Sequence, residues 1–491
     1  MVKKILKNAL LIGSVLLAVI LVSQIWFSSY FLPDGYGFFV SSFHRRIITP
    51  VMDFFKQDGG STFSQNLQNL YKPERIVVNV SGERCAYVEG QESYAEAYAL
   101  SNDILNRMLT GAYKVKSKTT IDMDAYTSAL KGKSIYVDYG KNCDYRLFSF
   151  SISGKSQSRF SDDLSAVSGH VISLQDSIMN DISLYIIDQK SSNIFRYVIE
   201  ANNKDEVNQK MEELRAQTPS AGSLSYSFEL NFHKEQENAA SKILFEPMIL
   251  MDLAPAQVSR FESHRLDEFV QGISEDMINT ILRTFSINTR SMWHYTDLTN
   301  ARVFVENNAT LTLSPDGLIE YQTVGNGRGL DISDNKNAYD IYAATDNAMD
   351  FVTRLCSHMP PEIFENLRIR TDMVDDADKQ GVYHIYFDYC VDGIPIRHKT
   401  ETGYAHTIEM EINNGYLKSY RQYIRTYEKT NQEKITALPV LSAADLLVDA
   451  LYKEPEPLRV QRINLCYVED EAGVLTPTWN ALIGGQEHIV Q

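Results

Sequence analysis

The sequence predicts an α+β protein, with a single N-terminal transmembrane helix followed by three extracytoplasmic domains of antiparallel sheet with helices packed on one face. Three observations lead to this fold class. Residues 8–33 contain no charged side chain. Downstream of them, runs rich in β-branched residues alternate with segments whose apolar residues recur at helical spacing. The length of 491 residues, with 44% hydrophobic and 22% charged residues, is typical of a globular protein with two to four domains.

The N-terminal apolar run is long enough to cross a bilayer. Its core, residues 9–26, would form a helix of about 27 Å, close to the ~30 Å hydrocarbon layer. Three lysines lie among residues 1–7, so this tail is expected in the cytoplasm and the bulk of the chain outside the cell membrane. Trp26 and Phe27 stand where a signal peptidase needs small residues. We therefore interpret residues 8–33 as an uncleaved anchor, with a cleaved signal peptide as the alternative.

One side of this helix has the residues that helix pairing uses. Ala9, Gly13, Ile20 and Gln24 project within about 60° of one another at 100° per residue. Ala9 and Gly13 form a small-xxx-small pair that lets two helices approach closely, and Gln24 can hydrogen-bond to a neighbouring helix. These four residues are the candidate helix–helix interface, and a plain anchor without pairing is the alternative.

Charge and cysteine usage exclude several classes of protein. The formal net charge of −16 argues against nucleic acid and anionic lipid as partners. The five cysteines are scattered without a C-x-x-C motif, which favours buried free thiols over a disulfide framework. A single bridge between Cys356 and Cys390 stays open.

After the anchor we expect a juxtamembrane spacer at residues 34–72 and an N-terminal α+β domain at residues 73–232. In that domain β-branched runs predict strands, and apolar residues at helical spacing predict helices. The expected strands are 76–80, 134–139, 182–187 and 193–200, and the expected helices are 94–109 and 204–216.

Two further domains are expected, a central domain at residues 233–335 and a C-terminal domain at residues 336–491. The central domain is expected to contain a helix near 277–285 and strands at 301–306, 310–313 and 318–323. For the last domain we expect a helix at 338–357, strands at 383–389, 408–412, 416–427 and 463–467, and a helix capped by Ser442 with Leu446, Leu447, Ala450 and Leu451 toward the core.

Motifs that could carry chemistry are weak. Ser333 and Lys336 fit the S-x-x-K pattern of serine acyl-enzymes, but they lie in a polar linker, and residues 399–403 read K-T-E-T-G instead of K-T-G. Residues 325–329 are glycine-rich without a phosphate-loop pattern, which favours a flexible loop. The acidic run 375–378 lacks the glycine and closing glutamate of an EF-hand, and the histidines show no zinc-ligand spacing. The sequence predicts no enzyme activity, no catalytic residue, no metal site and no cofactor.

Several stretches of the second half resemble the YycH family. Residues 293–302 (WHYTDLTNAR) followed by 318–321 (LIEY) resemble the central Y-T-D-G…R…L…Y stretch of that family, with Leu298 where the family often has glycine. The final domain resembles the one that YycH shares with YycI, at residues 387–396 (FDYCVDGIPI), 465–467 (LCY) and 475–479 (LTPTW).

The resemblance implies a single-pass accessory regulator of WalK (YycG), the essential cell-wall sensor histidine kinase of Gram-positive bacteria. It also implies a membrane complex with the kinase and a YycI-like protein, and it offers no catalytic residues. We therefore expect a membrane-anchored extracytoplasmic regulator that modulates such a two-component kinase through helix and exterior-domain contacts, without catalysis. A homo- or heterodimer stays open. The alternative is an anchored binding module for a cell-wall fragment or peptide, with a pocket that uses some of the aromatic residues or a deep polar cleft.

Overall fold

The computed structural model describes residue 67 and residues 70–490, with gaps at 92, 156–159, 161, 176–179, 218–223, 234–241, 267–272, 307, 326, 334–339, 371–380, 402, 454 and 471. The predicted tail 1–7, the anchor 8–33 and most of the spacer 34–72 lie outside the described residues. Within the described residues, no helix has both the length and the apolar character that a membrane crossing requires.

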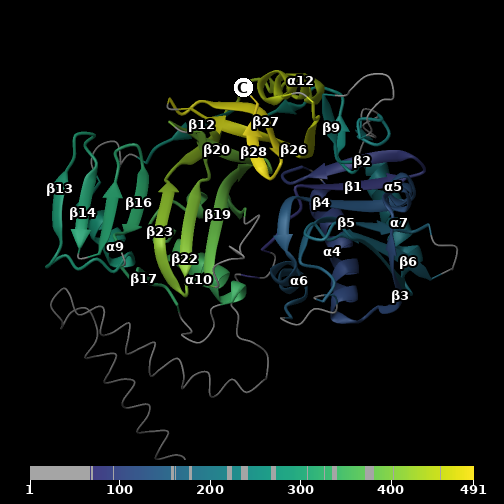
Figure 1. The fold of residues 1–491 in the computed structure, drawn as a ribbon, viewed down its shortest axis with the longest axis horizontal. Coiled ribbons are helices and arrows are strands. Elements are labelled where there is room, and N and C mark those ends of the chain that lie inside the picture. The colour runs from purple at the N-terminus through teal and green to yellow at the C-terminus, as the bar shows by residue number, and fades with distance from the viewer. Residues whose placement is uncertain are drawn as a thin grey trace, which may run out of the picture.

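The N-terminal part of the chain builds a seven-stranded antiparallel sheet in the order β2-β1-β4-β5-β6-β7-β3 (Figure 1). The four strands predicted here are confirmed as β1, β4, β6 and β7, and β6 pairs with β7. The strands are β1 (Arg75–Val80), β2 (Glu83–Val88), β3 (Lys114–Ile121), β4 (Ser134–Asp144), β5 (Ala166–Ser173), β6 (Asp181–Ile187) and β7 (Ile194–Glu200).

Helices cover both faces of this sheet, which corrects the prediction of helices on one face. The helices are α4 (Tyr94–Thr110), α5 (Met123–Lys131), α6 (Tyr145–Ser153) and α7 (Lys204–Gln217), of which α4 and α7 confirm predicted helices. Ile76 and Val78 of β1 pack in one core cluster with residues of α4, α6 and α7. Val77, between them, packs in a second cluster with Tyr126 and Leu130 of α5. Because successive strand residues point to opposite faces, an apolar run such as this one needs cover on both sides.

A second, larger sheet of fifteen strands forms the rest of the molecule (Figure 1). Its main path is β13-β14-β15-β16-β23-β22-β19-β20-β26-β27-β28, with β17, β18, β21 and β9 pairing at its sides. The strands are β9 (Ile243–Phe245), β13 (Trp293–Thr296), β14 (Arg302–Glu306), β15 (Ala309–Leu313), β16 (Leu318–Thr323), β17 (Leu330–Asp331), β18 (Leu367–Ile369), β19 (Val382–Val391), β20 (Ile394–Thr400), β21 (Gly403–Ala405), β22 (Ile408–Asn413), β23 (Tyr416–Tyr423), β26 (Leu458–Glu469), β27 (Leu475–Ile483) and β28 (Gln486–Ile489).

This sheet is continuous across the predicted central and C-terminal domains. β16 of the predicted central domain pairs antiparallel with β23 of the predicted C-terminal domain, so the two share one sheet. The sheet is mostly antiparallel, but β26 pairs in parallel with both β20 and β9. The domain boundary between residues 335 and 336 stays a prediction. Three two-stranded pairs complete the strand pairing: β8 (Leu224–Tyr226) with β10 (Leu250–Asp252), β11 (Gln257–Val258) with β25 (Ile435–Thr436), and β12 (Phe261–His264) with β24 (Thr426–Lys429).

Four helices belong to the same part of the chain as the second sheet: α9 (Glu275–Thr284), α10 (Ile341–Cys356), α11 (Glu362–Glu365) and α12 (Val440–Leu451). The predicted strand 416–427 divides, since β23 ends at Tyr423 and β24 leaves to pair with β12. The predicted capping by Ser442 is wrong, because α12 begins at Val440 after Pro439. Its buried stripe is Val440, Ala443, Ala444 and Leu447, while Leu446 and Ala450 are exposed.

All five cysteines are buried free thiols, as predicted. Cys356 and Cys390 are not bridged.

Candidate functional site

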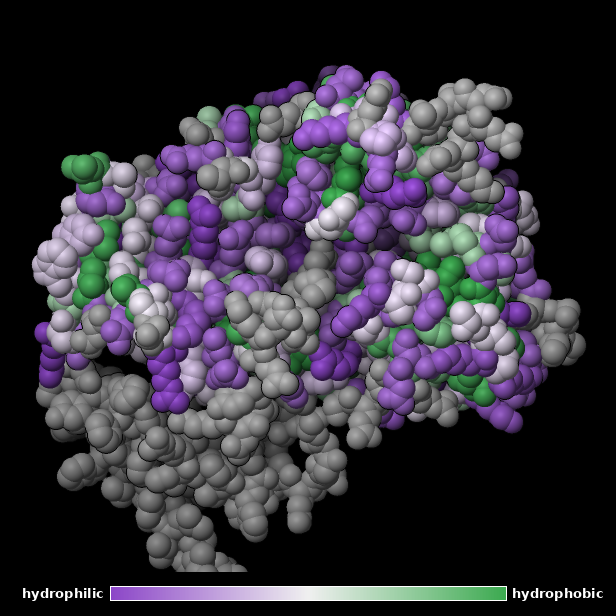
Figure 2. Space-filling model, viewed as in Figure 1, coloured by the Kyte–Doolittle hydropathy of each residue, from purple (hydrophilic) through white to green (hydrophobic). Residues whose placement is uncertain are grey.

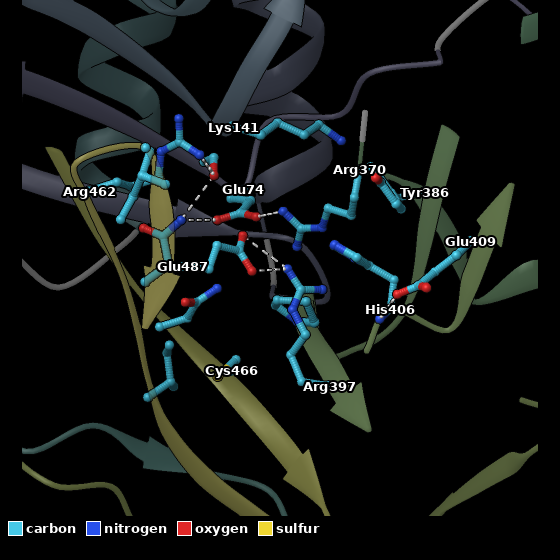
Figure 3. A pocket seen from close by; sticks show the side chains of 17 residues that line it. Glu74, Lys141, Arg370, Tyr386, Arg397, His406, Glu409, Arg462, Cys466 and Glu487 are labelled. Carbon is cyan, nitrogen blue, oxygen red and sulfur yellow. Dashed lines mark hydrogen bonds and ion pairs between the residues drawn. The ribbon is translucent and has the colours of Figure 1, made fainter. Parts of the chain in front are cut away.

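A polar cavity of about 360 Å³ lies between the N-terminal sheet and the C-terminal strands (Figure 3). Small-molecule sites favour such junctions between structural units. The lining residues come from both units: Glu74, Gly140 and Lys141 from the N-terminal part, and Arg370, Tyr386, Pro395, Arg397, His406, Glu409, Arg462, Asn464, Leu465, Cys466, Asn480, Leu482, Gly485 and Glu487 from the rest.

Asp388 of β19 is the centre of the charged groups at this cavity. The strand alternation sends Phe387 and Tyr389 into the core, whereas Asp388 points to the opposite face. Its fully buried carboxylate pairs with the Arg397 guanidinium, lies 3.4 Å from Arg370 Nε, and contacts His406 Nδ1 at 2.9 Å. A buried carboxylate is stable only with such partners.

The turn at Asp392 and Gly393 brings Asp388 and Arg397 together. This turn joins β19 to β20, so Arg397 folds back beside Asp388, nine residues earlier in the chain. Arg397 also donates to Glu487 of β28, with Nη2 at 2.9 Å from Oε2. Arg397 therefore connects three strands of the second sheet.

Glu74 and Arg370 connect the two sheets directly. The Arg370 guanidinium donates to one oxygen of Glu74, and Asn464 Nδ2 donates to the other at 3.0 Å. The approach requires glycine at position 140, where φ is +62° and an added Cβ would lie 1.9 Å from the Glu74 carboxylate. Arg462 of β26 donates to the Gly140 carbonyl at 2.8 Å. The junction is thus held by charged and polar contacts from Glu74 before β1, Arg370 after β18, and residues of β4 and β26.

Burial sets the protonation of the titratable groups. It lowers the pKa of His406 to about 3, together with the charge of Arg397, so the imidazole is neutral at pH 7. Burial and the nearby Arg370 lower the pKa of Lys141 to about 8, and its ammonium donates to the Ile369 carbonyl. Burial raises the pKa of the Cys466 thiol to about 12, which makes it a poor nucleophile.

The Glu487 carboxylate is ionised at pH 7. Burial alone would raise the pKa of Glu487, but the charge of Arg397 and the side-chain hydrogen bonds from Asn480 and Arg397 lower it to about 2. Four basic side chains at the junction face an equal number of acidic ones: Lys141, Arg370, Arg397 and Arg462 against Glu74, Asp388, Glu409 and Glu487. This arrangement holds the two units together and can bind a small polar molecule that offers both donors and acceptors.

A second buried ionic cluster, around Glu469 of β26, lies on the side of β12 and β24. Its carboxylate contacts His398 Nδ1 at 3.0 Å and Arg425 Nε at 3.0 Å. Ser263 and Tyr427 donate their hydroxyls to it at 2.7 and 2.9 Å. Burial would raise the pKa of Glu469, but these partners lower it to about 2.

The candidates predicted from sequence either lie outside the described residues or, where they are described, do not line the cavity. Ala9, Gly13, Ile20 and Gln24 lie outside the described residues, as do Lys336 and the acidic run 375–378. The Ser333 hydroxyl donates to Asp331 at 2.6 Å, an ordinary local turn contact. In the glycine-rich stretch, Gly327 and Gly329 pack against strands β16 and β23. The described part of the chain contains no group of three His, Cys, Asp or Glu side chains that could hold a metal ion.

Sequence reasoning missed the ionic centre, although a signal for it exists. The stretch 387–396 is apolar except for Asp388 and Asp392, and Arg397 follows it directly. A charged residue within an apolar strand indicates a buried partner. Asp388 pairs with Arg397, and Asp392 accepts from Ser259 and Lys429.

Among solved structures, the chain is similar to YycH from Bacillus subtilis, with a TM-score of 0.52 and 12% identity over 87% of this chain and 98% of that one. It is also similar to an uncharacterized protein from Eubacterium rectale (TM-score 0.28, 15% identity, 53% and 92% covered) and to the YpeB C-terminal domain of Bacillus megaterium (TM-score 0.23, 11% identity, 45% and 98% covered). No protein-family model and no curated protein matches. The likeness to YycH shows a YycH-like α+β fold over most of the chain, as the resemblance implied.

Proposed function

We propose that the chain is a membrane-anchored extracytoplasmic regulator of a cell-wall sensor histidine kinase of the WalK type, acting without catalysis. The observation that carries this proposal is the YycH-like fold over 87% of the chain. The uncharged run 8–33 supports a membrane anchor with residues 1–7 in the cytoplasm. The proposed exterior units are residues 73–232, 233–335 and 336–491, the last of them YycI-like.

The regulator would act by contact. We infer that its influence passes through the anchor helix and the exterior units to the kinase and a YycI-like partner. A bound protein shifts a two-state kinase when it favours one state, and a preference of about 1.4 kcal/mol already changes the ratio tenfold. The cavity supports this non-catalytic role, because the carboxylates of Glu74, Asp388 and Glu487 are engaged by Arg370 and Arg397.

Co-purification of the full-length chain with the kinase from membranes tests the proposal. The variant carrying Gly13→Leu and Gln24→Leu adds bulk and removes the amide on the candidate helix face. Retained kinase should fall at least tenfold. The matched control carries Ala18→Leu and Val22→Leu on the opposite side of the same helix and should retain the kinase fully. Equal retention by both variants would remove the helix from the mechanism, and no retention by the unaltered chain would refute the proposal.

The cavity itself favours a second candidate function, an anchored binding module for a small polar ligand such as a cell-wall fragment or peptide. Its volume of about 360 Å³ suits a small molecule, and Tyr386 is the one Phe, Tyr or Trp among its lining residues. A polar ligand is therefore favoured over an aromatic-stacked one. Titration of the full chain with muramyl dipeptide, followed calorimetrically, should give a saturable signal that Arg462→Gln weakens at least tenfold. A signal that Arg462→Gln leaves unchanged, or no signal, contradicts this function.

A further inference from the structure

Strand β13, residues Trp293–Thr296, ends the main path of the second sheet (Figure 1). Among the described residues it pairs with β14 alone, so its outer edge presents backbone donors and acceptors without a strand partner there. All four of its residues are exposed.

Large apolar side chains gather at this edge. Trp293 is 65% exposed, Tyr295 is 42% exposed, and Leu298 in the following turn is fully exposed. The rings of Trp293 and Tyr295 lie side by side, with centroids 4.8 Å apart. Three of the nine exposed large hydrophobic residues of the described chain thus fall within six consecutive positions. Figure 2 shows hydrophobic groups at this end of the molecule. We name Trp293, Tyr295 and Leu298 the β13 edge surface.

The edge strand of the N-terminal sheet is charged instead of apolar. Strand β3 ends the N-terminal sheet and exposes Lys114, Lys116 and Lys118 along it. Lys116 also binds Asp181 at 2.6 Å. Lysines of this kind prevent another strand from adding to an edge. β13 contains no Lys, Arg, Asp or Glu, so it lacks that protection.

The two rings share their side of the sheet with two valines of β14. Trp293 is opposite Val305, and Tyr295 is opposite Val303, so these four side chains share one side of the sheet. Phe304 points to the other side, into the core that contains α9. A strand added beside β13 would therefore meet both rings with its alternate side chains.

We propose that an extended, uncharged segment of a partner protein's exterior domain adds to the second sheet as the strand beside β13, with alternate apolar side chains packed on Trp293 and Tyr295. We expect the bound segment to be a strand, because the outer edge of β13 offers a row of backbone N–H and C=O groups to which a strand can hydrogen-bond. A second copy of this chain is a poorer occupant, since each copy carries a net charge of −16. The four-residue edge is short, so the contact gains from two proteins anchored in one membrane, where their effective concentration is high.

This inference rests on the proposed function, whose kinase and YycI-like partner supply the exterior domain. In the test, p-benzoyl-phenylalanine is incorporated at position 295 of the full chain, in membranes that contain tagged kinase and tagged YycI-like protein. The matched control position is 253, an exposed leucine between β10 and β11. After irradiation, position 295 should give an adduct with a tagged partner at least tenfold above position 253.

Paired variants test the role of the rings. Trp293→Lys with Tyr295→Lys gives β13 the protection that β3 has, and should reduce that partner's co-purification at least tenfold. Leu253→Lys with Leu441→Lys replaces exposed leucines elsewhere and should leave it unchanged. An adduct with a second copy alone, equal adducts at both positions, or no loss in the lysine variant overturns the inference. If the partners still co-purify in those cases, the proposed function stands while the β13 contact falls.

Discussion

Tyr321 and Tyr420 lie directly opposite each other in the antiparallel pair of β16 and β23. Both rings contact Phe285, at the end of α9, with centroid distances of 5.2 and 5.6 Å. Phe351 of α10 lies 5.2 Å from Phe285 and completes the aromatic cluster. Residues from the predicted central domain and from the predicted C-terminal domain therefore share one core at the point where their strands pair.

Phe285→Ala should destabilise the protein by about 3–5 kcal/mol, because it empties a buried ring position shared by three aromatic neighbours. Urea unfolding of the full chain, followed by fluorescence and circular dichroism, measures this change. Exposed Tyr295→Ala is the control and should cost under about 0.5 kcal/mol. A loss below 1 kcal/mol for Phe285→Ala would contradict the shared core.

Asp388→Asn should cost about 3–5 kcal/mol, since it removes the charge that compensates two buried guanidinium groups, those of Arg370 and Arg397. Chemical denaturation at pH 7 measures the loss. Asp445→Asn, an exposed change on α12, provides the matched control and should be nearly neutral. Similar stability of the two variants would show that Asp388 is not the centre of the junction.

Acid should weaken the cluster around Glu469. The pKa of this carboxyl is about 2 in the folded protein, below its usual 4.5, so its ionised form stabilises the fold at and above pH 4.5. That contribution, about 3 kcal/mol, disappears as the pH falls from 4.5 to 2. Glu469→Gln should flatten the pH dependence of the unfolding free energy in this range, whereas exposed Glu428→Gln should not. Parallel curves for Glu469→Gln and the unaltered chain would refute this assignment.

Gly140→Ala tests the close approach at the junction. The alanine Cβ would require a left-handed backbone and would overlap the Glu74 carboxylate. Gly82→Ala has the same kind of backbone, with φ of +85°, but its Cβ would meet nothing within 4 Å. Thermal unfolding should show about 1 kcal/mol lost for Gly82→Ala and clearly more for Gly140→Ala. Equal losses would mean that the Glu74 contact contributes nothing.

Local patterns predicted most of the regular elements. The apolar stripe of Ala97, Ile104, Leu105 and Met108 predicted α4, because the helical period can be read from residues that are close together in the sequence. The ionic junction could not be predicted in the same way. Glu74 and Arg370 are 296 positions apart, and no local period connects them.

Tertiary context also explains the errors at particular elements. The stretch 416–427 has one continuous strand pattern, but β24 leaves the sheet because β12 offers a pairing edge. In α12 apolar residues surround most of the helix, and the side that packs on the core carries Val440, Ala443 and Ala444 instead of Leu446 and Ala450. The sequence pattern does not distinguish such alternatives, since packing decides between them.

The most direct test of the regulator hypothesis is the autophosphorylation rate of the purified kinase in proteoliposomes, with and without the full-length chain. The account predicts a change of at least fivefold, in either direction, that the Trp293→Lys and Tyr295→Lys variant reduces. A kinase rate unaffected by saturating full-length chain would contradict it.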